Sequence, residues 1–154
     1  MAIDVFGLGN TLVDIQTFID DKLLKKLKIN KGIMTLIDEK QSREVLTAIA
    51  DLRWQVAKEK ASYYWMEEGL TGQYYQYIDR QKLKGDLKAF FIEDYVLWMT
   101  KEANGVQRLD KEVRGIFWRN MPFPKELKEE LRKRSLVYDE LCIKDNNRAM
   151  SDGY

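Results

Sequence analysis

Residues 38–68 read DEKQSREVLTAIADLRWQVAKEKASYYWMEE and predict one long helix, around which we expect the rest of the chain to fold. Asp38 can accept a hydrogen bond from the backbone N–H of Gln41, as an N-cap residue does. Apolar residues then recur in steps of three and four, which is typical of an amphipathic helix. They are Val45, Ile49, Leu52, Val56, Tyr63 and Met66, and the charged Glu59 occupies the position between Val56 and Tyr63. Such a helix is about 45 Å long, so it is either a core helix of a bundle or a helix that dimerises.

The charge balance of the chain argues against several classes of function. The 154 residues include 26 Lys and Arg and 25 Asp and Glu, so the net charge is +1 and nucleic-acid binding is not favoured. No apolar run approaches the ~18 residues of a membrane span, and the start of the chain lacks the pattern of a secretory signal. The single cysteine, Cys142, suits a reducing compartment. We therefore expect a cytoplasmic protein that does not bind membranes.

The chain contains no histidine, which excludes catalytic and metal sites built on imidazole. A metal site would need carboxylate ligands, which suit Mg²⁺ or Mn²⁺. Two acidic pairs could supply them: Glu67 with Glu68, and Glu93 with Asp94. Four-helix nucleotide pyrophosphohydrolases carry Glu-Glu-x-x-Glu on one helix, and this spacing is not met here. The alternative is that these acids are solvated or form salt bridges, and we expect no cofactor.

The first 37 residues differ in composition from the rest. Segments 3–8, 12–18 and 32–37 are short runs of β-branched and apolar residues, and the first two flank a Gly9–Asn10 turn. The predicted fold class is α+β and mostly α. A small N-terminal β element (about 3–18 and 32–37) precedes a bundle of four to five helices that includes the long helix 38–68. The predicted division is 1–37, a helical bundle at 38–144 and a flexible tail at 145–154, within one compact unit.

The opening of the chain resembles the N-terminus of PfkB-type carbohydrate and nucleoside kinases, the ribokinase and adenosine-kinase group. The likeness is carried by VFGLGNTLVDI at 5–15 and KGIMTLIDEKQS at 31–42, and it covers about residues 3–48. It implies a first strand in a Rossmann-like sheet and a lid over the sugar at 16–37. It also implies that Asp14 contacts sugar hydroxyls, with Asn10 beside it. The alternative for Asp14 is a strand-end or turn residue without a ligand.

The chain departs from these kinases where their chemistry resides. The Gly-Gly-x-x-x-Asn substrate motif is missing from residues 51–72, and the catalytic Gly-Ala-Gly-Asp signature appears nowhere. Without it there is neither a base for the sugar hydroxyl nor an anion hole for the transferred phosphoryl group. We therefore do not expect kinase activity from this chain.

Further helices are predicted at 73–84, 87–103, 110–119 and 124–143. Helix 87–103 is apolar on nearly all sides, which indicates a place in the middle of a bundle. Asp86 and Asp110 are expected N-cap residues, and Asn104–Gly105 is a left-handed C-cap signal.

Aromatic residues are concentrated between Trp54 and Trp98, and adjacent ones cannot all point inward from one helix. The residues expected at an interface are Tyr63, Tyr64, Trp65, Tyr74 and Tyr75. The leading hypothesis is a non-catalytic helical binding, assembly or regulatory protein that meets a protein partner or self-associates. The second is a sugar- or nucleoside-binding protein that uses Asn10 and Asp14. The third is a Mg²⁺-dependent nucleotide phosphohydrolase that uses Glu67, Glu68, Glu93 and Asp94.

Overall fold

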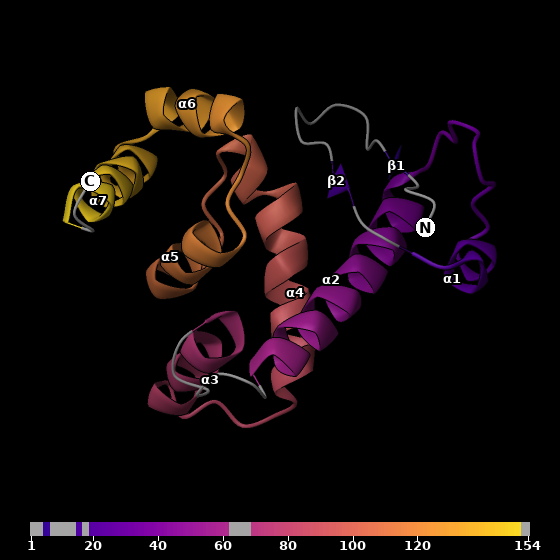
Figure 1. Ribbon diagram of the computed structural model, residues 1–154, viewed down its shortest axis with the longest axis horizontal. Helices are drawn as coiled ribbons and strands as arrows, with labels where there is room; N and C mark the ends of the chain where they lie inside the picture. Colours follow the sequence, from indigo (N-terminus) through magenta and orange to yellow (C-terminus); the bar gives the residue numbers. More distant parts are fainter. Residues whose placement is uncertain (1–4, 7–14, 17–18, 62–68, 152–154) are drawn as a thin grey trace.

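The computed structural model describes residues 5–6, 15–16, 19–61 and 69–151 (Figure 1). Its elements, in chain order, are β1 (Val5–Phe6), β2 (Ile15–Gln16), α1 (Asp21–Lys26), α2 (Glu39–Ala61), α3 (Leu70–Arg80), α4 (Leu87–Thr100), the 3₁₀ turn η1 (Glu102–Asn104), α5 (Lys111–Asn120), α6 (Lys125–Arg134) and α7 (Leu136–Ser151). None of the helices in these ranges is long and apolar enough to cross a membrane.

The predicted α+β class is wrong, because the described chain is an all-helical fold. The segment 32–37 forms no strand, and Ile33, Met34 and Leu36 in it are exposed to solvent. Within 3–18, the described residues contribute only a two-residue antiparallel pairing of β1 with β2, which does not make a sheet layer. The pattern failed because β-branched composition shows only that a segment can be extended, whereas a strand also needs a neighbour for its backbone hydrogen bonds.

Helix α2 begins as predicted, since Asp38 Oδ1 accepts a hydrogen bond from the backbone N of Gln41 at 2.7 Å. It packs along α4. Its buried residues are Val45, Leu46, Ile49, Ala50 and Trp54. The predicted stripe is therefore rotated, because Leu52 is only half-buried and Val56 is exposed. The predicted continuation at 62–68 lies outside the described residues.

Helix α4 occupies the centre of the fold, as its apolar composition predicts. It contacts α2, α3, α5 and η1 (Figure 1). Asp86 caps its first turn by accepting a hydrogen bond from the backbone N of Lys88 at 3.0 Å. After η1 the chain reverses at Gly105, which has a left-handed φ of 79°, so the predicted left-handed signal at Asn104–Gly105 is confirmed. It ends η1, whereas helix α4 itself ends at Thr100 and not at the predicted residue 103.

The core is a continuous series of aromatic ring contacts that joins α3, α4 and α5. Phe117 is fully buried and contacts the rings of Tyr74, Phe91 and Trp98 at centroid distances of 5.6–6.2 Å. Trp98 stacks on Phe123 at 4.1 Å, and its Nε1 donates a hydrogen bond to the carbonyl of Met121 at 3.3 Å. Most of the aromatic residues therefore stabilise the core through burial and ring geometry.

The C-terminal part forms two helices, where the sequence predicts one at 124–143. The break lies at Ser135, whose backbone is extended, with φ −154° and ψ 137°. Its hydroxyl oxygen accepts hydrogen bonds from the backbone N of Val137 and from Gln107 Nε2, a local alternative to the helical ladder. Helix α7 then runs to Ser151, so residues 145–151 of the expected tail are helical.

Replacing Phe117 by Ala should lower the free energy of unfolding by about 3–5 kcal/mol, because it leaves a cavity among three aromatic rings. Urea unfolding followed by circular dichroism measures this change. Leu83→Ala, at a residue that is 44% exposed, is the control and should change it by less than about 1 kcal/mol. Equal effects of the two substitutions would contradict the assigned core.

Candidate functional site

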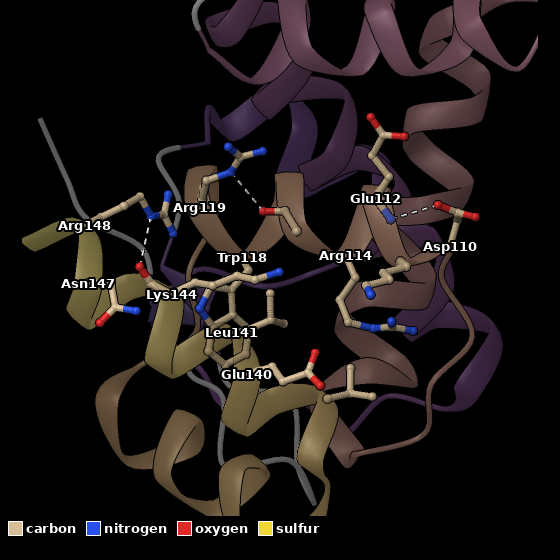
Figure 2. A pocket seen from close by; sticks show the side chains of 13 residues that line it. Asp110, Glu112, Arg114, Trp118, Arg119, Glu140, Leu141, Lys144, Asn147 and Arg148 are labelled. Atoms are coloured by element: carbon tan, nitrogen blue, oxygen red, sulfur yellow. Dashed lines mark hydrogen bonds between the residues drawn. The ribbon is translucent and has the colours of Figure 1, made fainter.

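A groove of about 900 Å³ lies between α5 and α7 and is open to solvent on one side (Figure 2). Its apolar lining includes Trp118 from α5 and Val137 and Leu141 from α7. Charged side chains from both helices also line it. Figure 2 shows Arg114 and Glu112 toward one end of the groove, with Asn147 and Arg148 toward the other. The site is thus an apolar floor enclosed by two charged helix faces.

A buried ionic network fixes the position of the groove's two helices. Glu102 is fully buried, and its carboxylate accepts two hydrogen bonds from Arg114, at 2.8 and 3.0 Å. The same carboxylate accepts from the Tyr138 hydroxyl at 2.8 Å. It also accepts from the backbone N atoms of Arg108 and Leu109, at 2.8 and 2.9 Å. Because Arg114 belongs to α5 and Tyr138 to α7, Glu102 joins both groove helices to η1.

The same network determines the protonation of its members. Burial alone would raise the pKa of Glu102, but the hydrogen bonds from Arg114, the two backbone N–H groups and Tyr138 hold this pKa below its ordinary value of 4.5. Burial would lower the pKa of Arg114, and the hydrogen bond to Glu102 raises it instead. Burial and the same carboxylate raise the pKa of Tyr138. Glu102 and Arg114 are therefore a charged pair, joined by two hydrogen bonds, that serves the structure.

A second polar contact set holds the C-terminal half of α7 against α5 and α6. The indole Nε1 of Trp118 donates to Asp145 Oδ2 at 2.6 Å. Lys128 of α6 bonds the same carboxylate at 3.2 Å and lies over the Trp118 ring at 4.9 Å. Arg148 pairs with the other oxygen of Asp145. The wall of the groove beside Trp118 is thus held in place from three elements.

The rim of the groove carries positive side chains that the fold leaves uncompensated. Lys111 and Arg119 of α5 and Lys144 of α7 have no acidic partner in the part of the chain that the structure describes. By contrast, Glu112 pairs with Arg80 on α3, and Asp110 caps α5 by accepting from the backbone N of Glu112 at 2.8 Å. Glu140 of α7 also lines the groove and has no charged partner in the described ranges, so three open cations stand against one open acid. This excess of positive charge above an apolar floor favours a ligand that is both acidic and apolar.

Most of the residues that the sequence singles out lie outside the described ranges. This holds for Asn10, Asp14, Tyr63, Tyr64, Trp65, Glu67 and Glu68, so their assigned roles stay predictions. Tyr75 is 52% exposed on α3 and is accessible to a partner. The interface prediction for Tyr74 is wrong, because this side chain is fully buried against Phe91 and Phe117.

The structure directs Glu93 and Asp94 to different partners. Glu93 forms an exposed salt bridge to Arg43 of α2 at 3.0 Å. Asp94 accepts a hydrogen bond from the Tyr74 hydroxyl at 2.5 Å, and burial raises the pKa of Asp94. The described ranges contain no cluster of three or more potential metal ligands. The carboxylate-site hypothesis therefore gains no support from this pair.

The sequence reasoning missed the groove and the network beneath it. One signal was present: Arg114 falls between Val113 and the inward-facing Phe117 on the helix that Asp110 caps. A cation on an inward face implies a buried acid elsewhere in the chain. Identifying Glu102 as that acid requires the reversal at Gly105, which brings η1 against α5.

Comparisons with known proteins identify a family and no function. A family model described as "Domain of unknown function (DUF8509)" matches residues 62–152, which is more than half of the chain. The chain therefore belongs to this family. No curated protein and no solved structure matches the chain.

Glu102→Gln should lower the free energy of unfolding by about 3–5 kcal/mol near pH 7, because Arg114 keeps its buried charge and loses its counter-charge. The pKa of Glu102 is lower in the folded than in the unfolded state. The charge of Glu102 therefore makes its full contribution to the free energy of unfolding above about pH 4.5. This contribution is lost as the pH falls through the lower folded-state pKa. Urea titrations at several pH values should show the gap between wild type and variant closing in that acid range.

The control for the Glu102→Gln substitution is Glu129→Gln, which removes the charge of an exposed acid on α6. It should leave stability within about 0.5 kcal/mol of wild type. A Glu102→Gln chain as stable as this control would show that the buried pair does not hold the groove helices.

Proposed function

We propose that this member of the DUF8509 family is a non-catalytic binding protein whose groove between α5 and α7 receives an acidic, amphipathic segment of a protein partner. The observation that carries the proposal is the combination of a half-buried apolar floor at Val137 and Leu141, with the buried Trp118 beneath it, and the uncompensated cations of the rim. A cytoplasmic location belongs to the same proposal, because the one cysteine of the chain, Cys142, is unpaired.

The groove is preformed, and this favours binding. Its walls are fixed by the Glu102–Arg114–Tyr138 network at one end and by the Asp145 contacts at the other. A ligand therefore orders few protein side chains beyond those of the rim cations when it enters, which lowers the entropic cost of association. A segment that is already helical in the partner would bind with the smallest cost.

The chemistry of the groove indicates what the segment carries. Aspartate or glutamate side chains would neutralise Lys111, Arg119 and Lys144 at the rim. Leucine-like or aromatic side chains would lie on Val137 and Leu141, above the buried Trp118. The volume of about 900 Å³ accommodates a few side chains of a short segment, since pockets of ~300–1,000 Å³ accept drug-sized ligands. The rim charges would act mainly on the rate of association and on specificity.

A nuclear magnetic resonance titration tests this proposal with a synthetic helical peptide of leucine and glutamate, about four turns long. The peptide should shift the Trp118 indole N–H signal, which Trp118→Phe identifies. The double substitution Lys111→Glu/Arg119→Glu should weaken binding by about ten-fold or more, because each reversal places like charges at the rim.

Two controls make the titration specific. Lys82→Glu reverses an exposed lysine in the turn after α3 and should leave the affinity unchanged. A peptide in which lysine replaces glutamate should not shift the Trp118 signal. An unmoved Trp118 signal at millimolar acidic peptide, or equal shifts with both peptides, would contradict the proposed function.

A further inference from the structure

The segment 22–36, which reads KLLKKLKINKGIMTL, concentrates positive charge in a chain that is nearly neutral. It contains five of the 26 basic residues and none of the 25 acidic residues, although the net charge of the whole chain is only +1. The segment comprises most of α1, the turn after it and the irregular stretch that leads toward α2. We call it the basic segment.

The lysines of the basic segment are exposed and largely without counter-charges. Four of them form no ion pair in the ranges that the structure describes: Lys22, Lys25, Lys26 and Lys28. The fifth, Lys31, pairs with Asp21 at 3.4 Å. Asp20, the neighbouring acid, accepts a hydrogen bond from the backbone N of Leu23 at 2.8 Å. The two acids beside the segment therefore leave most of its positive charge uncompensated.

Three large apolar side chains of the same segment project into solvent. Ile33, Met34 and Leu36 are 66%, 95% and 98% exposed. The exposed fractions of Met34 and Leu36 are the highest among the large apolar side chains that the structure describes. Figure 1 shows the stretch between α1 and α2 as a loop that extends away from both helices. Apolar side chains gathered in one exposed loop are typical of an interaction site.

Lysines beside exposed apolar side chains match the two layers of an anionic lipid surface. The headgroups attract the ammonium groups, and the acyl chains beneath them accept methionine, leucine and isoleucine side chains. A nucleic acid would satisfy the lysines, but its phosphate backbone offers no apolar layer to Met34 and Leu36. A protein partner would need a pocket shaped to the protruding loop, whereas a fluid lipid surface adapts to it.

We propose that the basic segment attaches this protein to membranes that contain anionic lipid. Ile33, Met34 and Leu36 insert below the headgroups, and the lysines lie at headgroup level. Such a peripheral contact needs no membrane-spanning helix. The expectation that the chain does not bind membranes rests on the absence of a spanning run, so it does not bear on this loop. The segment shares no residue with the groove, so this inference does not rest on the proposed function.

Co-sedimentation of the full chain with large unilamellar vesicles tests the proposal. Five lysines opposed by Asp20 and Asp21 leave three net positive charges, and each contributes about five-fold to binding near an anionic surface. The partition coefficient should therefore be about 100-fold higher when about one third of the phosphatidylcholine is replaced by phosphatidylserine. Sodium chloride at about 0.5 M should remove most of this preference, because it screens the charges.

A charge-reversal variant tests the lysines. Lys25→Glu/Lys26→Glu should remove the preference for phosphatidylserine, because it makes the local net charge negative. The matched control is Lys82→Glu/Lys84→Glu, which changes the net charge of the chain equally at two exposed lysines after α3. This control should keep the preference. Equal losses in the two variants would show that only the overall charge of the chain matters, which contradicts the proposal.

A second variant tests insertion of the apolar side chains. Met34→Ser/Leu36→Ser should lower the partition coefficient on phosphatidylserine vesicles by about ten-fold or more, because two side chains lose their contact with the acyl chains. Leu136→Ser is the control, since Leu136 is 80% exposed on α7, and it should bind as wild type does. Circular dichroism should show that both variants fold equally, because they replace exposed side chains.

A fluorescent label measures insertion directly. Met34→Cys in a Cys142→Ser background, labelled with the environment-sensitive dye nitrobenzoxadiazole, should gain emission on phosphatidylserine vesicles. Lipid that carries a nitroxide on its acyl chain should quench this emission. The same dye at Lys82→Cys should not respond to vesicles. An unchanged signal at Met34→Cys with the chain bound would show that the loop stays outside the acyl layer, and would overturn the proposed insertion.

The remaining outcomes also decide the proposal. A chain that sediments with neither kind of vesicle overturns it, as does a Met34→Ser/Leu36→Ser variant that binds phosphatidylserine vesicles like wild type. Binding to soluble heparin without binding to vesicles would assign the lysines to a soluble polyanion and would equally overturn it. The Trp118 titration with the acidic peptide should give the same affinity in Met34→Ser/Leu36→Ser. Failure of the groove proposal and failure of this one are therefore distinguishable.

Discussion

The carboxylate of Glu102 is the contact on which the C-terminal half of the molecule depends. It lies on a short 3₁₀ turn, fully buried, and receives five hydrogen bonds from Arg114, Tyr138 and two backbone N–H groups. A buried charge is strongly unfavourable unless it is paired and its lone pairs are satisfied. Since the partners come from α5, α7 and the connecting loop, satisfying one carboxylate fixes three parts of the chain relative to α4.

The groove follows from that position. The inner side of α7 carries Tyr138 to Glu102 and Asp145 to Trp118, which sets the distance between α7 and α5 and leaves the groove. A helix held by hydrogen bonds with fixed partners presents the wall of the groove in a defined orientation, and preorganised surfaces lose less entropy on binding.

Local signals in the sequence predicted much of the helical part. Asp38, Asp86 and Asp110 cap helices as their side chains allow, and the apolar circumference of 87–103 predicted the central place of α4. Each of these signals acts within one or two turns of chain. The predicted strand at 32–37 is absent, because strand formation depends on a neighbouring strand that no local sequence pattern can show. The prediction of a single helix at 124–143 failed, because the Ser135 hydroxyl that divides it by competing for backbone N–H groups leaves only a weak sequence signal. The groove could not be predicted, since Glu102 and Tyr138 are 36 residues apart and meet only after two helices have reversed direction.

Native-state hydrogen exchange tests most directly whether the Glu102 network joins α7 to the core. The backbone amides of 140–144 in α7 and of 115–119 in α5 should exchange with the same free energy of opening and the same dependence on urea, because the two helices would open together. In Glu102→Gln, the α7 amides should exchange faster than those of α5. Amides of α7 that exchange far faster than those of α5 in the wild-type chain would contradict the account, since α7 would then open alone.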